Sequence, residues 1–131
     1  MTELCYVLDS EGLSKSVLGN PAMRARLKEA HNSGIRVVTS SMTLIEAYHA
    51  KVPYAAWQWF LSRVSVEPVT EEVARAAITL LKRAGLHGHK YAIDAALAVI
   101  AGRQRGLVTV FTSDEDDMRQ LCPPHVLIRS L

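Results

Sequence analysis

The rest of this chain is organised around the stretch KYAIDAALAVIA, residues 90–101. From Tyr91 to Ala101, every residue is apolar or aromatic except Asp94. A helix that is apolar on all sides is buried in the protein, and this one is shorter than the ~20 residues that cross a bilayer. A charged carboxylate without a partner in such a helix costs several kcal/mol. Asp94 therefore either pairs with an arginine or caps a neighbouring loop, or it is a metal ligand or a catalytic carboxylate.

The composition is typical of a soluble, folded protein. The chain has 131 residues, 49% of them hydrophobic and 21% charged, which predicts one domain over residues 1–131. A net charge of +2 does not by itself indicate a nucleic-acid binder. Cys5 lies in an apolar run and Cys122 precedes two prolines, so we expect both to be reduced thiols. We find no signal peptide or membrane-spanning segment and expect a cytoplasmic protein with no membrane partner.

Short apolar runs alternate with helical patterns along the whole chain. Strands are expected at residues 4–8, 35–39, 64–68, 107–111 and 126–128, and helices at 21–33, 42–51, from 53 onward, 70–84, 90–105 and 114–121. This alternation predicts an α/β fold, a parallel sheet of about five strands with helices on both faces. In such sheets a ligand binds beyond the carboxyl ends of the strands, where the strand order reverses.

Polar residues mark where several of these elements begin and end. Asn20 is expected to cap the helix that starts at Pro21, and Ser113 is expected to cap the last helix. Residues 9–12 are expected to form a turn. In the helix over 42–51, the spacing predicts that Leu44, Ile45 and Tyr48 face inward.

Four acids are candidates for chemistry: Asp9, Glu46, Asp94 and Asp114. Taken alone, Asp9 could cap the following helix, Glu46 could be a surface residue, and Asp114 could be one of several first-turn acids that complement a helix dipole. Asp9 follows the first strand and Asp114 the fourth, so they would be neighbours if those two strands pair. The spacing alone does not decide that pairing. The combination of two acids at strand ends with one acid in an apolar helix favours a shared site.

Clustered carboxylates without His or Cys ligands suit Mg²⁺ or Mn²⁺. Such ions lower the pKa of bound water and stabilise the transition state of a phosphodiester displacement. The sequence has no Walker loop, glycine-rich dinucleotide turn or nucleophile elbow. His87 and His89 have no evident third ligand, so a zinc site is not favoured.

The chain resembles PIN-domain ribonucleases, and specifically the VapC-type toxins of bacterial toxin–antitoxin pairs. The resemblance runs nearly end to end, through YVLDS (6–10), SMTLIE (41–46), YAIDAALA (91–98) and VFTSD (110–114). It implies a three-layer PIN-like fold with strand order 3-2-1-4-5, which brings the first and fourth strands together. It also implies acids that bind Mg²⁺ or Mn²⁺ around an RNA phosphodiester.

The resemblance assigns roles to individual residues. Asp9, Asp94 and Asp114 would hold the metal, and Glu46 would bind it or orient the attacking water. In the fourth motif, Asp114 is the first choice of ligand and Asp117 the second, while Asp116 would be an acid of the helix end. Ser10, Thr112 and Ser113 would support the site, and the role of Glu11 stays open.

The expected function is a metal-dependent endoribonuclease that cleaves single-stranded RNA, as the toxin of a type II toxin–antitoxin pair. The resemblance implies a small antitoxin as partner, and we expect a homodimer. Trp57, Trp59 and Phe60 are candidates for an antitoxin groove or a dimer surface, or else belong to the core. Candidates for phosphate contacts are Arg24, Arg26, Lys82, Arg83, Lys90 and Arg103.

Two other functions are compatible with parts of the sequence. A non-enzymatic receiver-like module has a similar layout, but it needs an acid at the end of strand three and a lysine after strand five. Here these positions hold Val66-Glu67-Pro68 and Arg129, and Asp94 would have no role. A degenerate PIN module that only binds a partner is the other alternative, and the four intact acids argue against it.

Overall fold

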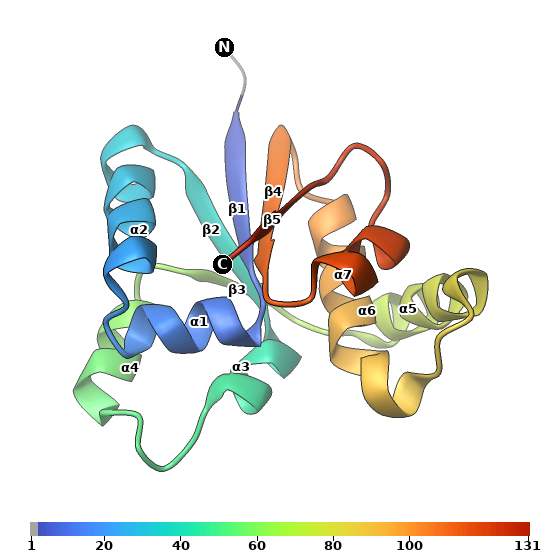
Figure 1. Ribbon diagram of the computed structural model, residues 1–131, viewed down its shortest axis with the longest axis horizontal. Coiled ribbons are helices and arrows are strands. Elements are labelled where there is room, and N and C mark those ends of the chain that lie inside the picture. Colours follow the sequence, from blue (N-terminus) through green and yellow to red (C-terminus); the bar gives the residue numbers. More distant parts are fainter. Residues whose placement is uncertain (1–2) are drawn as a thin grey trace.

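A five-stranded, all-parallel sheet forms the centre of the molecule, in the order β3-β2-β1-β4-β5 (Figure 1). The computed structural model describes residues 3–131. The strands are β1 (Leu4–Leu8), β2 (Arg36–Ser40), β3 (Ser65–Glu67), β4 (Leu107–Thr112) and β5 (Leu127–Ser130). The predicted α/β class and strand order are confirmed, and β1 and β4 are neighbours with Leu8 opposite Phe111. The carboxyl ends of the first and fourth strands therefore meet.

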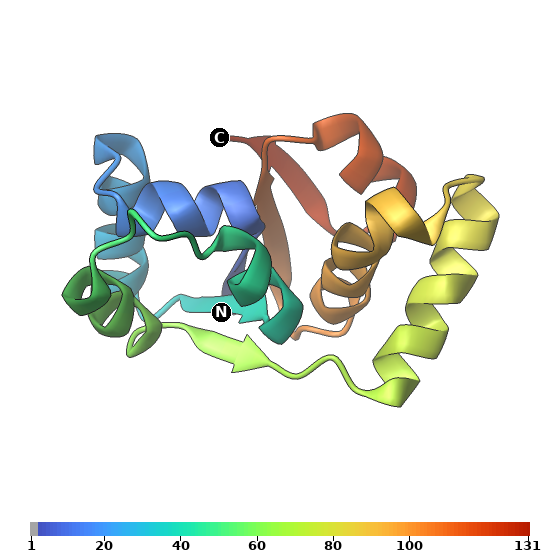
Figure 2. The same ribbon diagram turned by 90° about the horizontal axis from the view of Figure 1, so that it is seen from below.

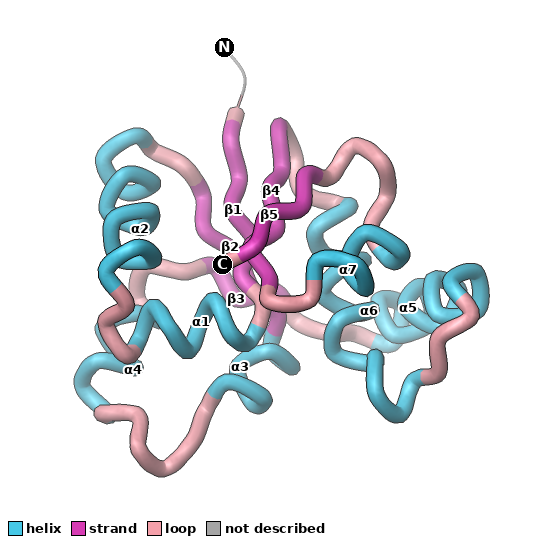
Figure 3. The backbone as a smooth tube through the Cα atoms, viewed as in Figure 1, coloured by secondary structure: helices cyan, strands magenta, loops and turns pink. Residues whose placement is uncertain are grey.

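Helices cover both faces of the sheet, which makes the three layers visible in Figures 1 and 2. The helices are α1 (Ser10–Val17), α2 (Pro21–Ser33), α3 (Ser41–Ala47), α4 (Tyr54–Leu61), α5 (Glu71–Ala84), α6 (Gly88–Gly102) and α7 (Glu115–Leu121). In the view of Figure 3, α1, α2 and α4 lie to one side of the strands and α5, α6 and α7 to the other. The short helix α3 lies at the carboxyl ends of the strands (Figure 2).

Each face of the sheet has its own apolar core, because side chains alternate between the faces along a strand. On β4, Val110 packs toward α5, α6 and α7, whereas Phe111 packs toward α1, α2 and α4. The apolar stretch quoted first lies in α6, where residues 95–101 are all buried. Ala92, one turn earlier, is exposed. The burial of α6 therefore begins next to Asp94.

The bend after α6 depends on a glycine. The helix ends at Gly102 and not at the expected Arg105, and Gly106 then adopts a φ of 83°. A Cβ at Gly106 would collide with the backbone carbonyl of Glu3. Only glycine combines this conformation with such a close approach to the start of β1.

Two expectations for the segments after β1 and β2 are wrong. Residues 9–12 do not form a turn, because α1 begins directly at Ser10. The helix expected over 42–51 ends at Ala47, and Ile45 and Tyr48 are 70% and 57% exposed although the spacing predicted that they face inward. This short helix at the carboxyl ends of the strands has only one side covered by protein, and Thr43 and Ala47 are buried on that side.

The predicted caps are confirmed at one helix and wrong at another. Asn20 accepts the backbone N–H of Met23 and caps α2 as expected. Ser113 does not cap α7, because Asp114 occupies the cap position and makes no side-chain cap hydrogen bond. No helix within residues 3–131 has the length and apolar character needed to cross a membrane.

Candidate active site

Asp9 ties the ends of β1 and β4 together. Its Oδ1 accepts the backbone N–H of Gly12 at 2.8 Å, which caps α1, and its Oδ2 accepts the N–H of Ser113 at 3.1 Å. The side chain is buried, and desolvation is the main reason why the pKa of Asp9 is raised, against the lowering effect of these hydrogen bonds and that of the Thr112 hydroxyl. Asp9 is thus both a helix cap and the most buried acid at this edge of the sheet.

The end of β4 places a hydroxyl and an acid next to Asp9. Thr112 is 1% exposed, and its Oγ1 accepts the backbone N–H of Asp114 at 2.9 Å. This bond turns the chain at the strand end and leaves Asp114 exposed, at the position before the first residue of α7. The negative charge of Asp114 raises the pKa of Asp9, so the two acids are close enough to repel each other.

Asp94 has the most perturbed carboxyl group of the site. Its pKa is raised to about 6, and burial in α6 is the main cause. The negative charges of Glu46, Asp114, Asp9 and Asp117 raise it further, in that order. Because each of these four charges raises the pKa of Asp94, all four acids lie near it. These five residues, Asp9, Glu46, Asp94, Asp114 and Asp117, are called the acidic cluster below.

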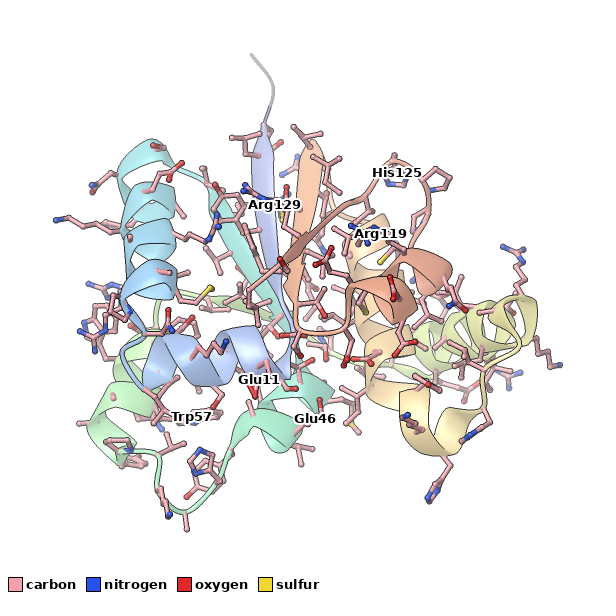
Figure 4. The ribbon with its side chains drawn as sticks, viewed as in Figure 1. Glu11, Glu46, Trp57, Arg119, His125 and Arg129 are labelled. Carbon is pink, nitrogen blue, oxygen red and sulfur yellow. The ribbon has the colours of Figure 1, made fainter. Side chains whose placement is uncertain are left out.

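Hydroxyl groups at the end of β2 position the helix that carries Glu46. Ser40 accepts the N–H of Thr43 at 3.0 Å and caps α3, and the two hydroxyls lie 2.8 Å apart. The Thr39 hydroxyl donates to the carbonyl of Leu8 at 2.8 Å, directly before Asp9. The sequence analysis did not identify Thr39 and Thr43, although a hydroxyl-rich run at a strand end is a possible signal. Glu46 itself is exposed (Figure 4).

The neighbouring acids of α7 differ in their surroundings. Asp117 is half-buried and contributes to the raised pKa of Asp94. The side chain of Asp116 is 97% exposed, lies 3.9 Å from Arg119 and does not perturb Asp94. This difference supports Asp117, and not Asp116, as the second candidate acid of the fourth motif.

The donor set of the acidic cluster fits a hard divalent cation. Within residues 3–131, the ion pairs involve other acids, so no member of the cluster is neutralised by a lysine or arginine. Cys122 lies nearby, but burial and the charge of Asp94 raise its pKa to about 12, so it stays a thiol and not a thiolate ligand. As the side chains stand in the described part of the chain, no three of the His, Cys, Asp and Glu groups are close enough to hold one metal ion.

Known proteins match this chain in sequence and in fold. The sequence matches the PIN domain family over residues 6–122. The chain belongs to the PIN-domain family. Among solved structures, it resembles a chain of the VapBC2 crystal structure from Rickettsia felis bound to a DNA fragment from their promoter, with a TM-score of 0.69 and 14% identity over 97% of this chain and 98% of that chain. No curated protein matches the sequence.

Membership of the PIN-domain family favours a nuclease over the receiver-like module. PIN domains are typically nucleases, which suggests the same class of activity here. The receiver-like alternative has strand order 2-1-3-4-5, and the observed order β3-β2-β1-β4-β5 differs from it. At 14% identity, the resemblance to the VapBC2 chain establishes the shared fold and nothing more.

An apolar groove of about 810 Å³ lies between α2 and α4, away from the acidic cluster. Leu27, Ile35 and Phe60 contribute to its apolar lining, and Arg24, Lys28, His31 and Arg63 add basic groups. Trp59 is 58% exposed at this groove and stacks on Arg63 at 4.2 Å from the ring centroid. Of the three aromatic candidates, Trp57 belongs to the core (Figure 4), Phe60 is buried beneath the groove, and Trp59 is available to a partner.

The candidate phosphate contacts are not equivalent in this PIN domain. Arg103 forms a two-pronged ion pair with Glu72, so its charge is already compensated. Arg24 lies against Gly19 and the groove, and Lys82 and Arg83 end α5 on the far side of the sheet. Lys90 stacks on Tyr91 one turn before Asp94. Arg26 lies on the ring of Phe111, next to the end of β4.

Proposed function

We propose that this PIN-domain protein is a metal-dependent endoribonuclease that cleaves single-stranded RNA, and that it is the toxin of a type II toxin–antitoxin pair. One observation carries the proposal: the pKa of Asp94 is raised to about 6 by four other acids, and no cation of the described residues compensates the cluster. Such an arrangement destabilises the folded protein unless a ligand uses it. Perturbed carboxyl groups of this kind are concentrated at functional sites.

The residues divide the chemistry among them. Mg²⁺ or Mn²⁺, when bound, would supply an activated water and neutralise charge on the phosphodiester. Asp9, Asp94 and Asp114 would hold the metal, and Asp117 would be an additional ligand. Glu46, exposed on the short helix α3, would bind the metal or orient the attacking water. The hydrogen bonds of Asp9 to Gly12 and Ser113 would keep its carboxylate fixed while the ligand binds.

Ser10, Thr112 and Ser113 would support the site without touching the reacting bond. The Thr112 hydroxyl orients Asp114 through its backbone N–H, and the Ser113 N–H orients Asp9. Ser10 is the first residue of α1, directly after Asp9. In this role these groups hold the carboxylates in place, as the outer groups around metal ligands do in general.

The toxin assignment and an antitoxin partner are supported by the resemblance to a chain of the VapBC2 structure and by the groove between α2 and α4. Trp59 would contact the antitoxin there, or a second copy of the chain in a homodimer. The cytoplasm is the expected location of such a protein. A degenerate PIN module that only binds a partner is the less favoured function, because all the acids are present and four of them raise the pKa of Asp94.

Cleavage of a single-stranded RNA with a fluorophore and a quencher at its ends tests the proposal. The purified protein should cut this substrate with Mg²⁺ or Mn²⁺ and stop when EDTA is added. Asp94→Asn should lose the activity, and Asp116→Asn is the matched control, since it makes the same change in an exposed acid beside Arg119. Cleavage that persists in excess EDTA, or in Asp94→Asn, would overturn the mechanism.

A further inference from the structure

Two arginines from distant parts of the chain lie against one aromatic ring. The guanidinium carbon of Arg26, on α2, is 4.7 Å from the ring centroid of Phe111, and that of Arg129, on β5, is 6.0 Å from it. Phe111 and Arg129 are also register partners across β4 and β5, so their side chains point to the same face of the sheet. Figure 4 shows Arg129 on β5, the strand at one edge of the sheet.

Neither of these arginines belongs to an ion pair within residues 3–131. The arginines that do are Arg36, Arg75, Arg103, Arg105 and Arg119, each with a glutamate or aspartate within 4.0 Å. Arg26 and Arg129 instead bring two positive charges toward the same ring. A guanidinium that is held on an aromatic ring keeps its N–H groups free to bind an anion such as a phosphate.

The ring that both arginines contact belongs to the residue of β4 whose backbone meets Asp9. The carbonyl of Phe111 accepts the backbone N–H of Asp9 at 3.2 Å, and the next residue is Thr112. An RNA strand that approached the acidic cluster alone would be repelled by up to five carboxylates. Basic groups on the face of β4 that carries α1 and α2 would offset this repulsion for phosphates that flank the cluster.

We propose that Arg26 and Arg129, supported by Phe111, form a subsite for the sugar–phosphate backbone of single-stranded RNA beside the scissile bond. The inference rests on the proposed function for the identity of the ligand. The two arginines are positioning residues, because they hold a flanking phosphate and not the reacting one. Contacts to phosphates give affinity and register without reading the bases, so the subsite binds RNA irrespective of sequence.

Binding of a fluorescein-labelled single-stranded RNA tests the subsite independently of cleavage. Anisotropy is measured with the full chain carrying Asp94→Asn, in Mg²⁺ and over a series of salt concentrations. Adding Arg26→Gln or Arg129→Gln should each weaken binding about fivefold near 0.1 M salt and reduce the salt dependence, d log K/d log[salt], by about 0.7. Arg83→Gln is the matched control, since Arg83 also has no ion pair among the described residues but lies on α5, across the sheet. It should change neither quantity.

Replacement by lysine separates charge from structure. Arg26→Lys and Arg129→Lys keep the charge and should retain most of the affinity, whereas equal losses for lysine and glutamine would overturn the subsite. Three other results would also overturn it. RNA binding could be absent altogether, it could be unchanged in a variant that carries both Arg26→Gln and Arg129→Gln, or it could be weakened equally by Arg83→Gln. If the wild type fails to cut RNA but binding still depends on both arginines, the nuclease proposal fails and the subsite stands. If the wild type cuts RNA but the glutamine variants bind RNA as tightly as before, the subsite fails and the nuclease proposal stands.

Discussion

Asp94→Asn should stabilise the metal-free protein at neutral pH, although it removes the central acid of the site. The pKa of Asp94 in the folded protein is about 6, against 3.8 for an unperturbed group. A difference of about two pH units corresponds to about 3 kcal/mol between the charged and neutral forms. Asparagine has nearly the same shape as the neutral acid, so the variant avoids the cost of burying a charge among four others.

The pH dependence of this effect has a definite sign. Between pH 3.8 and about 6, the folded protein binds more protons at Asp94 than the unfolded chain does. The free energy of unfolding of the wild type therefore falls as the pH rises through this window, and it stays low above pH 6. The free energy of unfolding of Asp94→Asn should not fall in this way, because asparagine does not ionise. Relative to the wild type, the variant should thus gain up to about 3 kcal/mol, or about 10 °C in Tm, between pH 4 and pH 7.

Thermal melting in EDTA over this pH range measures the difference. Asp116→Asn is the control, and its free energy of unfolding should stay within about 0.5 kcal/mol of the wild type because Asp116 is exposed. Mg²⁺ or Mn²⁺ should raise the Tm of the wild type and have little effect on Asp94→Asn, since a ligand stabilises the state that binds it. A variant less stable than the wild type in EDTA at pH 7, with no stabilisation of the wild type by either metal, would refute the reasoning. Asp94 would then be the partner of a buried donor.

Three further outcomes are expected. Asp117→Asn should reduce RNA cleavage strongly and Asp116→Asn only slightly, and equal rates for the two variants would show that the fourth motif is misassigned. Thr112→Val removes the hydroxyl that lowers the pKa of Asp9 and accepts the N–H of Asp114. Its loss should therefore move the acid limb of the pH–rate profile to higher pH. It should also lower the free energy of unfolding, measured by chemical denaturation, by about 1–3 kcal/mol. Trp59→Ala should leave the Tm nearly unchanged but weaken antitoxin binding or dimerisation, measured by calorimetry and analytical ultracentrifugation. If it changes neither, the role assigned to Trp59 is wrong.

Local patterns in the sequence were sufficient for most elements of the fold. The alternation of apolar runs with helical spacing predicted the parallel sheet, because each strand of such a sheet is buried on both faces. Asn20 marked the start of α2, since a cap bonds to a backbone N–H only two or three residues away. The helix α1 was not predicted, because its sequence SEGLSKSV is poor in strong helix formers and depends on the cap by Asp9 and on packing.

The residues with unusual chemistry, above all an acid in an apolar helix, can be identified from the sequence alone. How they act on one another depends on the tertiary structure, because these effects link residues far apart in the chain. The bond between Asp9 and Ser113 spans 104 positions, and the repulsion that raises the pKa of Asp94 comes from four other elements or strand ends. The same holds for Arg26 and Arg129, whose spacing in the sequence gives no hint that both contact Phe111. Electrostatic interactions depend on distance in space and on burial, and neither quantity is encoded by local periodicity.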